Sequence, residues 1–114
     1  MKLIFTFLFS FLIISQSHAI GQVSNVKVTH IRVDLDGRAM IFFSESIGGT
    51  PASCVHDAYK SAFGVDAATD GGKAVLSMAL TAKTTGSLVT VYGMGGCGIY
   101  GGTVVETWNH GFIK

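Results

Sequence analysis

The chain has 114 residues, of which 48% are hydrophobic, with 8 Lys and Arg residues against 7 Asp and Glu residues. One of the basic residues, Lys2, lies in an apolar leader, so the rest of the chain has equal numbers of both signs and no net charge. A nucleic-acid-binding domain is expected to carry a basic excess, and this balance argues against nucleic acid as a partner. The length allows one small domain.

Residues 1–19 have the pattern of a secretory signal peptide. Lys2 supplies a positive start, residues 3–14 are apolar apart from two hydroxyl residues, and Ser17 and Ala19 put small residues at the −3 and −1 positions of a cleavage site. The apolar run is shorter than the about 20 residues that a membrane span needs. We therefore expect an exported chain of residues 20–114, periplasmic or secreted, that forms one domain and has no stable membrane insertion.

Cys54 and Cys97 are the only two cysteines. In an oxidising compartment an even pair is most simply one disulfide. Closing a loop of about 44 residues would stabilise the fold by on the order of 4 kcal/mol, a large share for a small core. A thiol nucleophile at Cys54, with His56 as its base, is the alternative interpretation.

The first half of the exported chain predicts a β-hairpin. Along residues 23–35 the apolar positions change from even to odd numbers, so we expect one long strand with a β-bulge near Thr29 and His30. Asp36 and Gly37 predict a tight turn. The second strand, residues 38–44, is apolar on both faces.

Alternating apolar residues over 54–65 predict a third strand, and a helix follows. Asp70 is the expected N-cap and Gly86 the expected C-cap. Small and apolar residues form one stripe at helical spacing, which could pack against a neighbouring subunit: Val75, Met78, Ala79 and Ala82, with Leu76 and Leu80 beside them.

The remaining chain predicts a fourth strand over residues 88–92, a glycine-rich loop over 93–102 and a last strand over 103–110. Three strands, one helix and two strands make a mainly β fold with one helix. This β-β-β-α-β-β order, with a long bent first strand, suits a five-stranded, partly open barrel of the OB type.

The sequence resembles two groups of proteins. The segment from Ala82 to Tyr92 resembles part of the pentameric OB-fold B subunits of bacterial AB5 toxins, including the subtilase-cytotoxin and pertussis-like groups. Three further patterns resemble small uncharacterised secreted proteins of Gram-negative bacteria: Pro-Ala-Ser-Cys at 51–54, Gly-Gly-Lys-Ala at 71–74 and Val-Tyr-Gly-Met-Gly-Gly-Cys at 91–97. The resemblance implies an exported domain.

We predict ligand-binding residues around the last strand. Glu106, Trp108 and His110 alternate and are expected to share one face, while Tyr92 and Tyr100 bracket the glycine loop. Aromatic and hydrogen-bonding side chains near OB loops suit a sugar or another small polar ligand. The alternative is that Trp108 fills the core and Glu106 is solvated.

Other chemistries have weaker patterns. Residues 93–98 match G-x-G-x-x-G, but no helix follows them, which argues against a dinucleotide site. His30, His56 and His110 lack metal-ligand spacing. We therefore expect no catalytic residues, no metal and no cofactor.

The function that we predict is a secreted, non-enzymatic binding module for a glycan or another small polar ligand. Its low charge also favours self-association into a homo-oligomer. The alternatives are a small periplasmic hydrolase or thiol enzyme that uses Cys54, His56 or Glu106, and an envelope inhibitor or structural protein.

Overall fold

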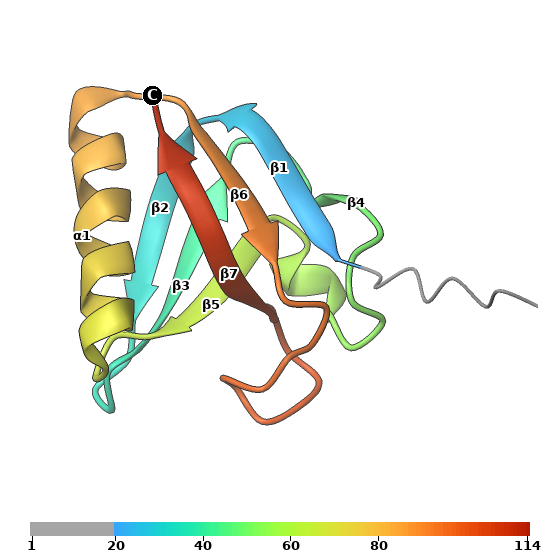
Figure 1. The fold of residues 1–114 in the computed structure, drawn as a ribbon. Coiled ribbons are helices and arrows are strands. Elements are labelled where there is room, and N and C mark those ends of the chain that lie inside the picture. Colours follow the sequence, from blue (N-terminus) through green and yellow to red (C-terminus); the bar gives the residue numbers. More distant parts are fainter. Residues whose placement is uncertain (1–19) are drawn as a thin grey trace, which may run out of the picture.

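A computed structural model describes residues 20–114, and the predicted signal peptide, residues 1–19, lies outside the described residues. This part of the chain is mainly β with one helix, α1 (Figure 1). Its strands form one mixed sheet in the order β2-β3-β5-β7-β6-β1-β4, which is not closed. The strands are β1 (Gly21–Val26), β2 (Val28–Val33), β3 (Arg38–Phe43), β4 (Gly48–Gly49), β5 (Ala62–Asp66), β6 (Val89–Gly93) and β7 (Glu106–Ile113).

The predicted long first strand is divided into β1 and β2, with only Lys27 between them. β1 pairs with β6 near one edge of the sheet, whereas β2 pairs with β3 at the opposite edge. The β2–β3 register shifts between Val28 and His30, where the sequence predicts a bulge. The strand therefore changes partners partway along its length.

The predicted hairpin turn joins β2 to β3. The N–H of Asp34 donates to the carbonyl of Arg38 at 2.7 Å, and the N–H of Gly37 donates to the carbonyl of Asp34 at 3.0 Å. Gly37 has a φ of 92°, a conformation that favours glycine. The turn brings charged side chains from both strands to one end of the sheet.

The predicted third strand over 54–65 is wrong in its first half. Only Ala62–Asp66 forms β5, and before it lies a loop with a short 3₁₀ helix, η1 (Asp57–Tyr59). β5 begins opposite Phe42, near the end of its partner β3, so the residues before Ala62 have no strand to pair with. The alternation of apolar residues before Ala62 has another cause, since Tyr59 packs on the sheet from the loop.

The helix α1 (Asp70–Thr85) begins one residue earlier than predicted, because Asp70 is its first residue and not its N-cap. Thr69, and not Asp70, is the N-cap, because its Oγ1 accepts from the N–H of Gly72 at 3.0 Å. Gly86 is the C-cap as predicted, with a φ of 71°. No helix within residues 20–114 is long and apolar enough to cross a membrane.

The small-residue stripe of α1 faces the chain's own core. Ala79 and Ala82 are buried there, and Val75, Leu76 and Met78 pack against it in part. Leu80, by contrast, is 51% exposed. The idea that this stripe packs against a neighbouring subunit is therefore wrong, because the sheet already covers it.

Strand β3 is buried on both faces, as predicted, because two apolar clusters meet it. Ala39, Ile41 and Phe43 point into the main core, together with residues of β1, β5, β6, β7 and α1. Met40 and Phe42 point to the opposite face. There they form a second cluster with Ala62 and Val105, against which Tyr59, Tyr100 and Val104 pack.

The last two strands are displaced from their predicted bounds. β6 covers 89–93, one residue later than predicted, and β7 covers 106–113 instead of 103–110. The loop between them is longer than the glycine-rich segment, and Gly95, Gly101 and Gly102 have positive φ there. It returns the chain so that β7 pairs parallel to β5 and antiparallel to β6.

Candidate functional site

A disulfide joins Cys54 to Cys97, as the sequence predicts. It connects the loop before β5 to the loop between β6 and β7. Both sulfurs are engaged, and no free cysteine is found in the described residues. Cys54 therefore has no thiol to act as a nucleophile beside His56.

Glu106 is fully buried, so the alternative in which it is solvated is wrong. Its Oε1 accepts from the N–H of Ala52 at 2.7 Å, and its Oε2 accepts from the N–H groups of Gly21 and Gly95 at 2.8 and 3.3 Å. A Cβ on Gly93 would lie 1.7 Å from Oε2, so only glycine leaves room for the carboxylate. Glu106 ties three segments of backbone together and is out of reach of a ligand.

Trp108 belongs to the main core. It is 6% exposed, and its ring centroid lies 6.4 Å from that of Phe43 and 6.5 Å from that of Phe63. The sequence left its place open between core and ligand site. In the structure it fills the core.

His110 does not share a face with Glu106 and Trp108, which corrects the predicted arrangement. Trp108 pairs with Gly93 and His110 pairs with Tyr92, so Asn109 is an extra residue in β7. Such a bulge reverses the alternation of side chains. His110 is exposed and stacks on Tyr92, with ring centroids 4.8 Å apart.

Tyr100 lies apart from the other four predicted residues, in a surface groove of about 470 Å³ that we call the Tyr100 groove. The groove lies over β3, between the β2–β3 hairpin, the η1 segment and the β6–β7 loop. It is lined by Arg32, Arg38, Met40, His56, Ala58, Tyr59, Tyr100, Thr103 and Val104.

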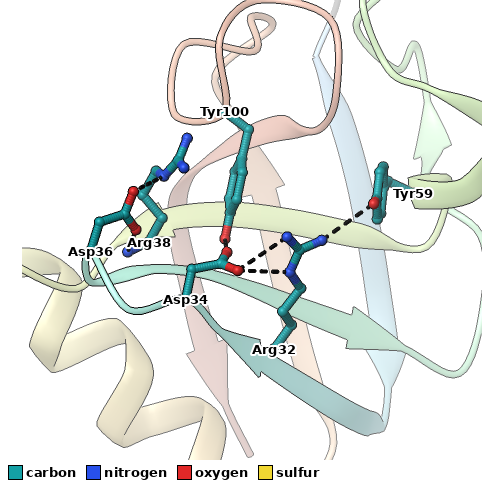
Figure 2. A network of polar contacts seen from close by, with 6 residues as sticks. All are labelled: Arg32, Asp34, Asp36, Arg38, Tyr59 and Tyr100. Atoms are coloured by element: carbon teal, nitrogen blue, oxygen red, sulfur yellow. Dashed lines mark hydrogen bonds and ion pairs between the residues drawn. The ribbon is translucent and has the colours of Figure 1, made fainter.

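A polar network that joins three segments lies beside the groove (Figure 2) and includes four of its lining residues, Arg32, Arg38, Tyr59 and Tyr100. The hydroxyl of Tyr100 donates to Oδ2 of Asp34 at 2.5 Å. Arg32 donates from Nε to Oδ1 of Asp34 at 3.1 Å, and from Nη1 to the hydroxyl of Tyr59 at 3.3 Å. The β2–β3 hairpin, η1 and the β6–β7 loop are thus joined through side chains.

Arg38 is held differently. Its Nε lies 2.6 Å from Oδ2 of Asp36 in an ion pair, but this nitrogen is buried and does not make an aligned hydrogen bond. Figure 2 shows the ring of Tyr100 between the two arginines. The guanidinium carbons of Arg38 and Arg32 lie 4.7 and 5.6 Å from the ring centroid, within the range of cation–π attraction.

The network favours the ionised form of Asp34 and the neutral form of Tyr100. The hydrogen bond from Tyr100 and then those from Arg32 lower the pKa of Asp34 below its ordinary value of 3.8. Burial, followed by the hydrogen bond to Asp34, raises the pKa of Tyr100 well above its ordinary value. At neutral pH the carboxylate therefore accepts and the phenol donates.

His56 also lines the groove, where it caps η1. Its Nδ1 accepts from the N–H of Ala58 at 3.1 Å, so in the neutral ring the proton is on Nε2. Within residues 20–114 no group of three His, Cys, Asp or Glu side chains could hold a metal ion. The side chains that line the groove offer hydrogen-bonding groups and aromatic rings.

Sequence reasoning placed Tyr100 near a ligand but missed Arg32, Arg38 and Tyr59. It interpreted Asp36 only as a residue of the tight turn. The signal was a charged residue at every second position around one turn, Arg32, Asp34, Asp36 and Arg38, which puts two acids between two arginines at the end of a hairpin. Which face they occupy depends on the bulge in β2.

Comparisons of the chain with protein-family models, with curated proteins and with solved structures find no match. The groove itself is therefore the main evidence for a function.

Proposed function

We propose that the chain is an exported, non-enzymatic binding module that holds a glycan or another small polar ligand in the Tyr100 groove. The observation that carries this proposal is a groove that combines tyrosine rings with fixed hydrogen-bonding groups. Aromatic rings cover the apolar faces of a sugar, and directional polar groups select its hydroxyls. Tyr59 provides an aromatic ring, and Arg32 and Arg38 provide directional polar groups.

We further propose that the sheet is a five-stranded, partly open barrel of the OB type, in which β1 and β2 count as one bent strand. The support is the chain order β1/β2, β3, β5, α1, β6, β7 and the parallel pairing of β5 with β7. OB folds bind oligosaccharides and oligonucleotides on their second and third strands, between the first and last hairpin loops. Those elements correspond to β3, β5 and the two loops beside the groove.

The charges of the groove favour a sugar over a nucleic acid. Arg32 and Arg38 are each paired with a neighbouring aspartate, so the groove has no excess of positive charge. A phosphate backbone is bound by uncompensated lysines and arginines. The weak resemblance to B subunits of AB5 toxins, carried by residues 82–92, agrees with a glycan-binding role.

Two observations support a role without catalysis and outside the cytosol. The Cys54–Cys97 disulfide is typical of an oxidising compartment and removes the candidate thiol. Glu106, the candidate acid, is sealed in the core. Two of the three groups named for the enzyme alternative, Cys54 and Glu106, are thereby committed to structure.

A glycan array with the purified exported chain tests the proposal. Tyr59→Ala removes one aromatic wall of the groove, whereas Tyr92→Ala removes an aromatic side chain outside it. We expect the first variant to lose the array signal and the second to keep it. An array without signal above background, or a signal that only Tyr92→Ala removes, would contradict the proposal.

A further inference from the structure

Glu106 carries a buried negative charge for which residues 20–114 provide no cationic partner. Its hydrogen-bond donors are all backbone N–H groups, and no Lys, Arg or His side chain of those residues forms an ion pair with it. Three donors on two oxygens suit the ionised form, because a protonated carboxyl would itself need an acceptor. A buried carboxylate is costly unless hydrogen bonds and an opposite charge compensate it. A cation close to Glu106 would therefore stabilise the fold.

The backbone at the start of β1 lies directly against this carboxylate. The N–H of Gly21 donates to Oε2 of Glu106 at 2.8 Å, and a Cβ on Gly21 would lie 2.8 Å from Oε1. The carbonyl of Ile20 accepts from the N–H of Thr50 at 3.0 Å, so the peptide between Ile20 and Gly21 is held at both ends. Because one residue spans at most about 3.6 Å of chain, the nitrogen of Ile20 lies within about 6.5 Å of Oε2.

Ile20 is also the residue that follows the predicted cleavage site at Ser17 to Ala19. Before cleavage, the nitrogen of Ile20 belongs to a neutral peptide bond. Hydrolysis of that bond consumes one water molecule. The carbonyl carbon of Ala19 becomes a carboxylate, and the nitrogen of Ile20 becomes a primary amine that is mostly protonated at neutral pH.

We propose that cleavage after Ala19 gives Glu106 its cationic partner, the α-ammonium of Ile20, and so completes a charge pair that the uncleaved chain lacks. Ile20 is partly buried, which limits screening of the pair by water and salt. Oε2 also accepts from Gly95, so the pair stabilises the start of the loop that leads to Tyr100 as well as β1. The pair depends on the predicted cleavage and is independent of the ligand of the Tyr100 groove.

The other charged side chains on the segments around Ile20 are exposed. Glu45 precedes β4, and Asp57 and Lys60 follow it and pair with each other at 3.4 Å. The strands β1, β4 and β6 contain no charged residue. Among these described segments, Glu106 is therefore the buried charge on which an ammonium at Ile20 acts.

Urea unfolding of the exported chain, with and without a charge on its first residue, tests the proposal. Chains that begin at Ile20 are compared with a free and with an acetylated α-amine, and the same two forms are made with four Gly and Ser residues added before Ile20. We expect acetylation at Ile20 to lower the folding equilibrium constant about ten-fold. In the extended chain the charge is carried away from Glu106, and acetylation should change the constant by less than about two-fold.

Amide hydrogen exchange reports on the carboxylate's own contacts. The N–H groups of Ala52 and Gly95 lie far from Ile20 in sequence and meet it only through Glu106. Both should exchange more slowly in the chain with a free amine than in the acetylated chain. A local effect of the chain end would alter exchange at Gly21 alone.

Two variants identify the partner of the ammonium. Acetylation at Ile20 should have almost no effect on Glu106→Gln, whereas Glu45→Gln, the matched control, should keep the full ten-fold effect. The comparison is a double-mutant cycle, so the cost of Glu106→Gln itself cancels. If Glu106→Gln does not fold, the extended chains and the exchange of Ala52 and Gly95 decide.

Three results would overturn the proposal. The first is an exported protein whose first residue, by mass spectrometry, is not Ile20. The second is equal stability of the free and acetylated chains that begin at Ile20. The third is an acetylation effect that is as large in Glu106→Gln as in the unmodified chain, because the ammonium would then act on another group.

Discussion

Replacing Glu106 by Gln should destabilise the fold strongly, although it changes only one heavy atom. The carboxylate is fully buried and accepts from the N–H groups of Gly21, Ala52 and Gly95 at 2.7 to 3.3 Å. An amide has one acceptor oxygen and one NH₂ donor. Whichever way it turns, its NH₂ faces at least one backbone N–H that then has no acceptor.

The size of the effect follows from these contacts. A buried donor without a partner costs about 1–3 kcal/mol, and hydrogen bonds to a charged acceptor are stronger than neutral ones. If the amide of the Glu106→Gln variant turns its NH₂ toward Ala52, it keeps the two contacts on the other oxygen in weakened form. We therefore expect a loss of about 2–4 kcal/mol, a large part of the about 5–15 kcal/mol that stabilises a typical domain.

Urea unfolding followed by the fluorescence of Trp108, the only tryptophan, measures this loss. With a slope of about 2 kcal/mol per molar urea, in the middle of the range for small proteins, the midpoint of Glu106→Gln should fall by about 1–2 M. Glu45→Gln, at an exposed glutamate, is the matched control and should stay within about 0.5 kcal/mol of the unmodified chain. A Glu106→Gln midpoint equal to that of the control would refute the structural role of the carboxylate.

Further predictions concern the disulfide, the groove and the helix. Reducing Cys54–Cys97, which closes a span of 43 residues, should cost on the order of 4 kcal/mol in urea unfolding, and a reduced chain as stable as the oxidised one would contradict the bond's role. The pKa of Asp34 is lowered on folding, so its contribution to stability is present above its ordinary value of 3.8 and is lost as the pH falls through the folded value. Tyr100→Phe removes the main cause of the lowered pKa of Asp34. Urea midpoints measured from pH 6 down to pH 2 should therefore fall less steeply for this variant than for the unmodified chain. Parallel curves of midpoint against pH for the two proteins would count against the Tyr100–Asp34 contact. Leu80→Gln, on the outer side of α1, should change the unfolding free energy by less than about 0.5 kcal/mol, whereas a loss of 2 kcal/mol or more would place this residue in an interface.

Most of the secondary structure could be predicted because local signals agreed with the fold. The Asp36–Gly37 turn, the Gly86 cap and the change of phase near His30 are properties of a few neighbouring residues, and the structure contains all three. The disulfide followed from the count of cysteines and the expected compartment.

The segment before β5 could not be predicted, since its pattern has another cause. Val55 and Tyr59 repeat at a spacing that is compatible with a strand. In the structure both are partly buried, and Tyr59 packs from η1 onto the outer face of β3. Periodicity alone does not distinguish a strand from a loop that is held against a sheet.

The candidate site escaped prediction for a similar reason. One extra residue at Asn109 turns His110 away from Trp108, and the bulge in β2 decides which face Arg32 occupies. A bulge of one residue exchanges the two faces of a strand, and sequence alternation cannot locate it to a single residue. Glu106 looked like a surface acid because its three backbone partners come from distant segments.

Amide chemical shifts measured during titration with a glycan selected on the array test directly whether the Tyr100 groove binds the ligand. We expect the largest changes at Arg32, Tyr59 and Tyr100, on three separate segments around the groove. Changes confined to Tyr92 in β6 and His110 in β7, or spread evenly over the chain, would show that the ligand does not bind in the groove.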